Sequence, residues 1–153
     1  MDTQEIFAPA GGVGQACPAP APSPGRYAIL RHCRSTDTHY DLLLEVPGHE
    51  LLATWQVFVP PERWGAAPVA ATKLPDHRRM YLDYEGPISN DRGAVTRVDA
   101  GIQKLLELSP LRWRCVLRSS HCEGAEMALV LIRDNRAEPK CSNDDWTLTV
   151  QHA

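Results

Sequence analysis

Two histidines and an aspartate, His32, His39 and Asp41, lie within ten residues of one another and are the side chains best suited to chemistry. Two imidazole nitrogens and one carboxylate oxygen form a common ligand set for a catalytic divalent metal, because they leave positions open for water or substrate. Paired histidines near a turn also serve as hydrogen-bonded structural groups. The residue types and their spacing therefore leave two alternatives open, a three-ligand metal site and a structural histidine pair.

The surrounding sequence predicts a β-hairpin that gathers these residues. Side chains alternate across a strand, so we expect His39 and Asp41 on one face while Tyr40 and Leu42 point from the other toward a core. His32 lies seven residues before His39, and the polar run between them is typical of a turn. We therefore expect His32 opposite His39, at the same edge of the hairpin.

A second candidate pair is His77 and Tyr81. His77 stands beside charged residues, so it is either an exposed loop histidine or a group that donates a hydrogen bond or proton to a phosphate oxygen or leaving group. Tyr81 could add a phenolic donor to the same anion, or it is an ordinary strand aromatic. In a regular strand Asp83 and Glu85 would share its face, which makes them candidates for orienting the metal ligands.

Phosphate and base contacts have fewer candidates. Arg34 lies in the predicted turn between the ligands, and Arg78 and Arg79 adjoin His77. Each is either an exposed surface arginine or a group that reaches a substrate phosphate from a loop, and Arg34 is the first choice for the second role. Trp64 lies in a loop rich in proline and glycine, where an exposed ring could stack on a base. The other tryptophans, Trp55, Trp113 and Trp146, sit in apolar strand patterns and are predicted to be core residues.

Short runs of β-branched, aromatic and alternating apolar residues dominate the rest of the chain. Eight or so short strands with little helix favour an all-β domain, either a closed antiparallel barrel or a sandwich. Residues 102–108 could form one or two helical turns. The predicted strands cover residues 27–32, 40–46, 51–59, 69–74, 80–86, 94–99, 111–117, 125–132 and 146–150.

The chain has 153 residues, of which 43% are hydrophobic, enough for one domain with a true core. Residues 1–25 are rich in Pro, Ala and Gly and predict a flexible leader, so the folded domain is expected to cover residues 26–153. The chain contains no apolar run of membrane-spanning length, and its first residues are acidic rather than basic. We therefore predict a cytoplasmic protein without a membrane segment.

Charge and cysteine content exclude other classes. A formal net charge of −3 gives no overall basic field for strong non-specific nucleic-acid binding, so only local cations could hold a phosphate. The five cysteines form no CxxC pair, which argues against both a disulfide framework and a zinc ribbon.

Several motifs follow one another in a fixed order along residues 26–150. They are His32, then His39-Tyr40-Asp41-Leu42-x-Leu44-Glu45, an apolar strand with Trp55, Asp76-His77-x-x-x-Tyr81-x-x-Tyr84-Glu85-Gly86, and Val98-Asp99-x-Gly101. This series resembles the 3′-phosphoesterase domain of bacterial DNA ligase D. The resemblance rests on the order of the whole set, since any single motif is too short to be specific.

The resemblance implies a small closed β-barrel and a manganese-dependent hydrolase. Such an enzyme trims DNA 3′ ends during non-homologous end joining, removing a terminal ribonucleoside and then the 3′-phosphate. It implies a DNA 3′ end or primer-template as substrate, with ligase or polymerase repair proteins as partners. By motif, His32, His39 and Asp41 would bind Mn²⁺, although nitrogen and oxygen ligands also suit Zn²⁺. His77 and Tyr81 would contact the phosphate and assist turnover.

Leu43 stands where members of this family usually carry an arginine, two residues after the aspartate. A cation that would hold the scissile phosphate is thus missing from the strand. The alternative is a non-catalytic module that uses the same pocket to bind a DNA end or a repair protein. The absence of net basic charge also admits a third class, a metallophosphoesterase acting on small phosphate esters.

Overall fold

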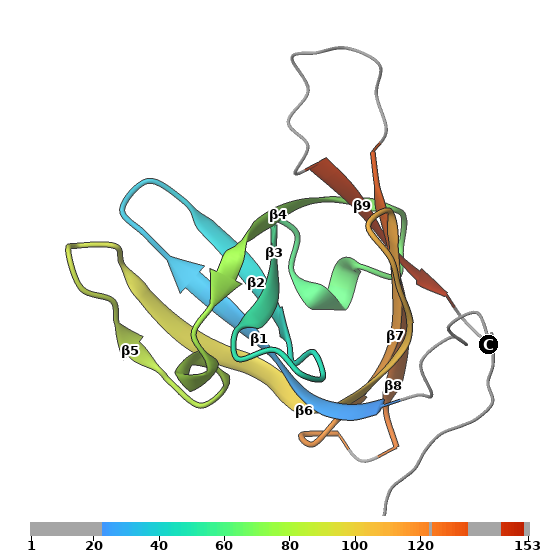
Figure 1. Cartoon of the computed structure of the whole chain (residues 1–153). Helices are drawn as coiled ribbons and strands as arrows, with labels where there is room; N and C mark the ends of the chain where they lie inside the picture. Colours follow the sequence, from blue (N-terminus) through green and yellow to red (C-terminus); the bar gives the residue numbers. More distant parts are fainter. Residues whose placement is uncertain (1–22, 123, 135–144, 152–153) are drawn as a thin grey trace, which may run out of the picture.

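The fold is a closed β-barrel with an extension on one side (Figure 1). The computed structural model describes residues 23–122, 124–134 and 145–151. Within these residues the strands are β1 (Ser23–Cys33), β2 (Thr38–Leu44), β3 (Leu52–Val57), β4 (Val69–His77), β5 (Gly86–Pro87), β6 (Ala94–Leu108), β7 (Arg112–Ser119), β8 (Glu126–Arg133) and β9 (Asp145–Gln151).

Eight of these strands form the barrel in the order β1-β2-β3-β4-β9-β8-β7-β6, and pairing between β1 and β6 closes it. All pairings are antiparallel, and the short β5 adds to the edge of β6. Two 3₁₀ helices, η2 (Pro61–Arg63) and η3 (Arg79–Leu82), are the helical elements of the described residues. The predicted all-β class, a closed antiparallel barrel of about eight strands with little helix, is confirmed.

Apolar side chains fill the barrel interior. The ring of Trp55 lies edge-on to those of Trp113 and Trp146, with ring centroids 4.8 and 5.7 Å away. Trp64 belongs to this core as well: it is fully buried, and its indole Nε1 donates a hydrogen bond to the carbonyl of Val59 at 2.7 Å. The predicted core tryptophans are thus confirmed, whereas the predicted exposed stacking role of Trp64 is wrong.

A smaller apolar cluster lies on the outside of the barrel wall. Leu42 and Leu44 point into the barrel, so the alternating residues Asp41 and Leu43 of the same strand face outward. The chain from η3 to β5, residues 79–87 (the covering segment), lies over this outer face and buries Leu43. The members of the outer cluster are Ala28, Leu30, Leu43, Leu52, Leu82 and Val95.

Two predicted elements differ from the structure. Residues 102–108 are not helical but continue β6, because this long strand pairs with β1 on one side and β7 on the other. Residues 80–86 are not one strand: the amide of Tyr81 donates to the carbonyl of Arg78, which begins the 3₁₀ turn of η3. Apolar residues alternate here because one side of the segment packs on the outer cluster. The same alternation is typical of a strand, so the pattern alone could not separate the two structures.

The predicted leader, residues 1–25, falls outside the described residues except for 23–25. Those three belong to β1, where Ser23 and Gly25 pair with Leu105 and Gln103 of β6. In the described part of the chain, no helix has the length and apolar character needed to cross a membrane.

Candidate metal centre

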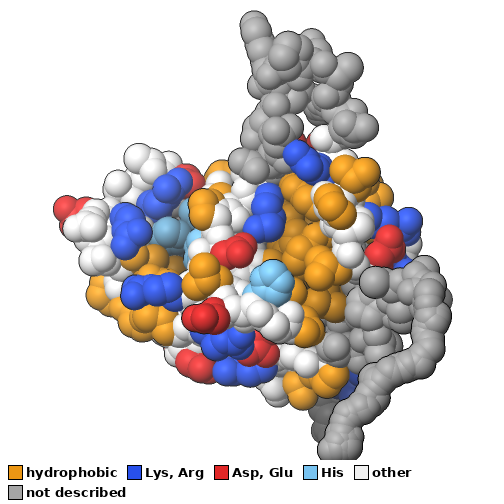
Figure 2. Space-filling model, viewed as in Figure 1, with side chains coloured by type: hydrophobic (Ala, Val, Ile, Leu, Met, Phe, Trp, Pro, Cys, Tyr) orange, Lys and Arg blue, Asp and Glu red, His pale blue; other side chains and the backbone are white. Residues whose placement is uncertain are grey.

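The β1–β2 hairpin extends beyond the barrel beside the β5 end of β6 (Figure 1). In its register His32 is the cross-strand partner of His39, as the sequence predicts. The turn is closed by a hydrogen bond from the amide of Arg34 to the carbonyl of Asp37, at 2.8 Å. In the same view, Lys and Arg side chains gather around a histidine on this side of the molecule (Figure 2).

The three predicted ligands meet on the outer face of the hairpin. Nδ1 of His32 lies 3.1 Å from Nε2 of His39 and 3.7 Å from Oδ2 of Asp41. Nε2 of His39 lies 3.3 Å from Oδ1 of Asp41. One ligand atom from each residue therefore falls within 4.8 Å of the others, which is compact enough for all three to touch one cation.

The outer nitrogens of both histidines are already used as donors. Nε2 of His32 donates to the backbone carbonyl of Arg92 at 2.6 Å, and Nδ1 of His39 donates to a carboxylate oxygen of Asp37 at 3.2 Å. Neither acceptor carries a proton that it could offer in return. In the neutral imidazoles the two inner nitrogens are therefore unprotonated, and both direct a lone pair into the same space.

Burial makes this arrangement informative. Asp41 and His39 are almost fully buried, and Oδ1 of Asp41 has no hydrogen-bond partner. Burial alone would lower the pKa of His39, but the carboxylates of Asp41 and Asp37 outweigh it, so the pKa is raised. Two lone pairs and a buried carboxylate that has only the two imidazoles as close partners attract positive charge. These residues fit a divalent cation, whose identity the geometry leaves open.

Asp37 is a residue that sequence reasoning missed. Its carboxylate binds Arg34 and His39 at once, and the hydrogen bond from Arg34 is the main reason that the pKa of Asp37 is lowered. The missed signal was its position two residues before His39, directly ahead of β2, where the alternation of the strand continues to the same side. Arg34 is the predicted phosphate contact, but its Nε donates a hydrogen bond to Asp37 at 2.7 Å. Arg34 also does not line the cavity that opens beside His32 and Asp41.

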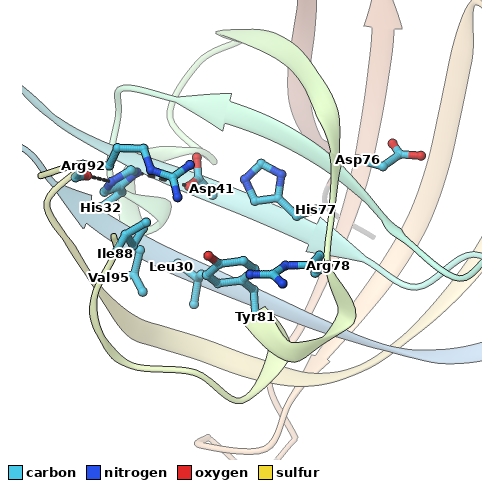
Figure 3. A pocket seen from close by; sticks show the side chains of 10 residues that line it. All are labelled: Leu30, His32, Asp41, Asp76, His77, Arg78, Tyr81, Ile88, Arg92 and Val95. Carbon is cyan, nitrogen blue, oxygen red and sulfur yellow. Dashed lines mark hydrogen bonds and ion pairs between the residues drawn. The ribbon is translucent and has the colours of Figure 1, made fainter. Parts of the chain in front are cut away.

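A cavity of about 260 Å³ opens beside the candidate metal site, between the barrel wall and the segment that runs from β4 to β6 (Figure 3). Its wall combines cationic, hydrogen-bonding and apolar side chains. It is lined by Leu30, His32, Asp41, Asp76, His77, Arg78, Tyr81, Ile88, Arg92 and Val95.

His77 and Tyr81 meet in this cavity, with ring centroids 5.9 Å apart. His77 ends β4, and its Nδ1 donates to the carbonyl of Pro75 at 3.0 Å. Its Nε2 is therefore unprotonated in the neutral ring. Figure 3 shows the imidazole pointing into the cavity toward the side where Asp41 lies. The structure thus brings both predicted catalytic residues to the candidate metal site, while their roles stay predictions.

The predicted ligand-orienting roles of Asp83 and Glu85 do not match their surroundings. Asp83 forms ion pairs with Arg26 at 2.5 Å and with Arg97 at 3.4 Å. Glu85 accepts a hydrogen bond from the backbone amide of Arg97. Because η3 interrupts the expected strand, these carboxylates fasten the covering segment to the barrel instead of reaching the ligands.

No protein-family model matches this chain, and no curated protein matches it. The fold and site alone define its class: a small antiparallel β-barrel with a candidate centre of two histidines and one aspartate on its outer wall.

Proposed function

We propose that this protein is a metal-dependent phosphoesterase acting on DNA 3′ ends, from which it removes a 3′-phosphate or a terminal ribonucleotide. One observation carries the proposal. Three ligand atoms converge at the edge of a cavity whose other polar groups include His77, Tyr81 and two arginines. Metal ligands beside phosphate-binding side chains are the combination that phosphoryl hydrolysis requires.

Each protein group has a role in this proposal. A bound divalent ion supplies positive charge for a phosphoryl oxygen and lowers the pKa of water. Tyr81 donates its phenolic hydrogen to a phosphate oxygen. His77, whose Nδ1 is held by Pro75, exchanges a proton at Nε2 with the attacking water or the leaving oxygen. The apolar residues Leu30 and Val95 shield one side of the cavity from solvent.

Manganese is the metal we propose, on the resemblance to the ligase D phosphoesterase domain, with zinc as the alternative that the same ligands would accept. A role in end joining, with ligase and polymerase partners, rests on that resemblance as well. The resemblance covers the motifs that contain the three ligands, His77 and Tyr81.

The second candidate function is a non-catalytic module that binds a DNA end or a repair protein. The observation that favours it is Leu43, which is fully buried where the family carries an arginine. A phosphate in the cavity would then lack the strand cation that the family uses in its transition state.

Incubation of the protein with Mn²⁺ and a primer-template that ends in a 3′-phosphate separates the two functions. The phosphoesterase releases inorganic phosphate, and Asp41→Asn and His77→Ala stop this release. Binding of the end without release supports the module instead. Nucleoside monophosphates serve as a parallel substrate, and faster turnover on them than on DNA ends would identify an esterase for small molecules.

A further inference from the structure

The strand position that carries the family's arginine cannot hold a phosphate here. Leu43 belongs to the outer apolar cluster with Leu30, Leu82 and Val95, and its side chain is fully buried. A cation at this place would be buried away from water under η3. Any cation that binds substrate must therefore come from another part of the chain.

Arg34 is an unsuitable source. Its guanidinium is engaged by Asp37 on the hairpin turn, and it is absent from the cavity lining. Recruiting Arg34 would break the ion pair that also holds the carboxylate beside His39.

Arg92 lies in the turn between β5 and β6, beside His32, and its side chain lines the cavity. Its carbonyl accepts the hydrogen bond of His32. Among the described residues its guanidinium bonds only to the carbonyl and hydroxyl of Ser89, at 2.9 and 3.1 Å. No carboxylate within the described residues pairs with it. Figure 3 shows this guanidinium pointing inward, toward the side of Asp41.

Arg78 enters from the other side. It precedes η3 and lines the cavity next to His77 and Tyr81, and its guanidinium makes no hydrogen bond or ion pair with any residue that the structure describes. Figure 3 shows it directed into the cavity, opposite Arg92. His32 and Asp41 of the candidate metal site line the same cavity.

These two arginines differ from most others in the described chain. Arginines outside the cavity are largely neutralised, whereas Arg78 and Arg92 keep their positive charge available. An arginine without a carboxylate partner, directed into a polar cavity, is suited to bidentate binding of a phosphate. The arginines that form ion pairs with carboxylates are Arg26, Arg34, Arg79, Arg97, Arg112, Arg114 and Arg118.

The turn that carries Arg92 is held in place. Asn90 and Asp91 both adopt positive φ angles, of 63° and 54°, and the amide of Ile88 donates to the carbonyl of Gly93 at 2.8 Å. Gly93 has a φ of 89°, and a Cβ there would lie 2.1 Å from the carbonyl oxygen of Cys33. This close approach presses the turn onto β1, so Arg92 is positioned before any ligand binds.

We infer that Arg92 and Arg78 together bind the terminal phosphate monoester of the substrate, supplying from two loops the charge that Leu43 removes from the strand. The inference rests on the proposed function for its substrate. It goes further by naming the two residues that hold the phosphate. It also predicts that the protein binds a DNA end with a phosphate monoester more tightly than one with a hydroxyl. A dianionic terminal phosphate presents enough oxygens to meet two guanidinium groups and a cation at once.

The test is made in a His77→Ala background, which the proposed function predicts to bind the end without releasing phosphate. It compares binding of two fluorescent primer-templates, ending in a 3′-phosphate or a 3′-hydroxyl, by anisotropy with Mn²⁺ present. Arg92→Gln and Arg78→Gln should each weaken binding of the phosphate end about tenfold or more. The double variant should lose the preference over the hydroxyl end. Arg63→Gln is the matched control, because Arg63 is exposed in η2, away from the cavity lining, and should change nothing. Circular dichroism and Mn²⁺ binding, measured by electron paramagnetic resonance, should be unchanged in all variants.

A parent protein with no preference for the phosphate end, or a double variant that keeps it, would overturn the inference. Loss of Mn²⁺ binding in Arg92→Gln would also overturn it, since Arg92 would then act through His32. Failure of the proposed function gives a different result. If the parent releases no phosphate but the variants still lose the binding preference, the two arginines are an anion site in a non-catalytic module.

Discussion

The carboxylate of Asp37 lies 3.2 Å from Nδ1 of His39 and fixes which nitrogen of that ring faces the candidate metal site. Through the carbonyl of Arg92, the ring of His32 is fixed in the same way. In their neutral forms both histidines therefore present unprotonated nitrogens toward the buried carboxylate of Asp41. Such outer contacts commonly set the affinity of a metal site.

Replacing Asp37 should weaken the metal site without dismantling the hairpin. In Asp37→Ala, Nδ1 of His39 loses its acceptor, so the ring samples the wrong tautomer and orientation. We expect affinity for Mn²⁺ to fall by about 10- to 100-fold, measured by isothermal titration calorimetry. Ser35→Ala in the same exposed turn is the control and should bind Mn²⁺ like the parent. Equal affinity for Mn²⁺ in both variants would show that Asp37 does not support the metal site.

Gly93→Ala tests whether the Arg92 turn must lie against β1. Gly93 and Gly48 both have positive φ, so alanine strains either backbone, by about 1 to 2 kcal/mol. Only at Gly93 would the new Cβ collide with a backbone carbonyl, whereas Gly48 has open space around it. We therefore expect Gly93→Ala to lower the free energy of unfolding more than Gly48→Ala does, in urea titrations. It alone should also weaken Mn²⁺ binding, because the carbonyl that holds His32 moves.

An arginine at position 43, where the ligase D phosphoesterase family that the sequence resembles usually carries one, should harm this protein. The side chain of Leu43 is enclosed by apolar neighbours, so Leu43→Arg buries a charge without a partner. We expect a loss of about 3 kcal/mol or more in unfolding free energy, and no gain in phosphate release. Leu43→Met conserves volume and polarity and should cost less than about 1.5 kcal/mol. A stable Leu43→Arg protein with faster turnover would show that the covering segment moves aside to accept a cation at this position.

Asp83 gives the covering segment a defined pH dependence. Its hydrogen bond and ion pair with Arg26 are the main cause of a pKa lowered from 3.8, so folding favours the ionised carboxylate. The stabilisation is therefore present above pH 3.8 and is lost as pH falls through the lowered native pKa. In thermal melts, the parent should be more stable than Asp83→Asn near pH 7, and the difference should shrink toward pH 3. A difference independent of pH would rule out this ion pair as its source.

The sequence predicted the hairpin and the clustering of His32, His39 and Asp41 because these features depend on nearby residues. Alternation fixed the faces of His39 and Asp41, and the polar run fixed the turn that brings His32 opposite His39. Arg92 could not be predicted in this way, since it reaches His32 across 60 residues through a turn whose path depends on the pairing of β5 with β6. The helical prediction for residues 102–108 failed for the same reason: partners on both sides of β6 decide its conformation.

The account depends most directly on metal binding by His32, His39 and Asp41. Isothermal titration of the metal-free protein with Mn²⁺, repeated with Zn²⁺, tests it. We predict one ion per chain and a raised melting temperature, with binding abolished in His39→Ala and Asp41→Ala and retained in the control His121→Ala. If the parent binds neither ion, or the ligand variants bind as tightly as the parent, the cluster is a structural histidine pair and the proposed mechanism is wrong.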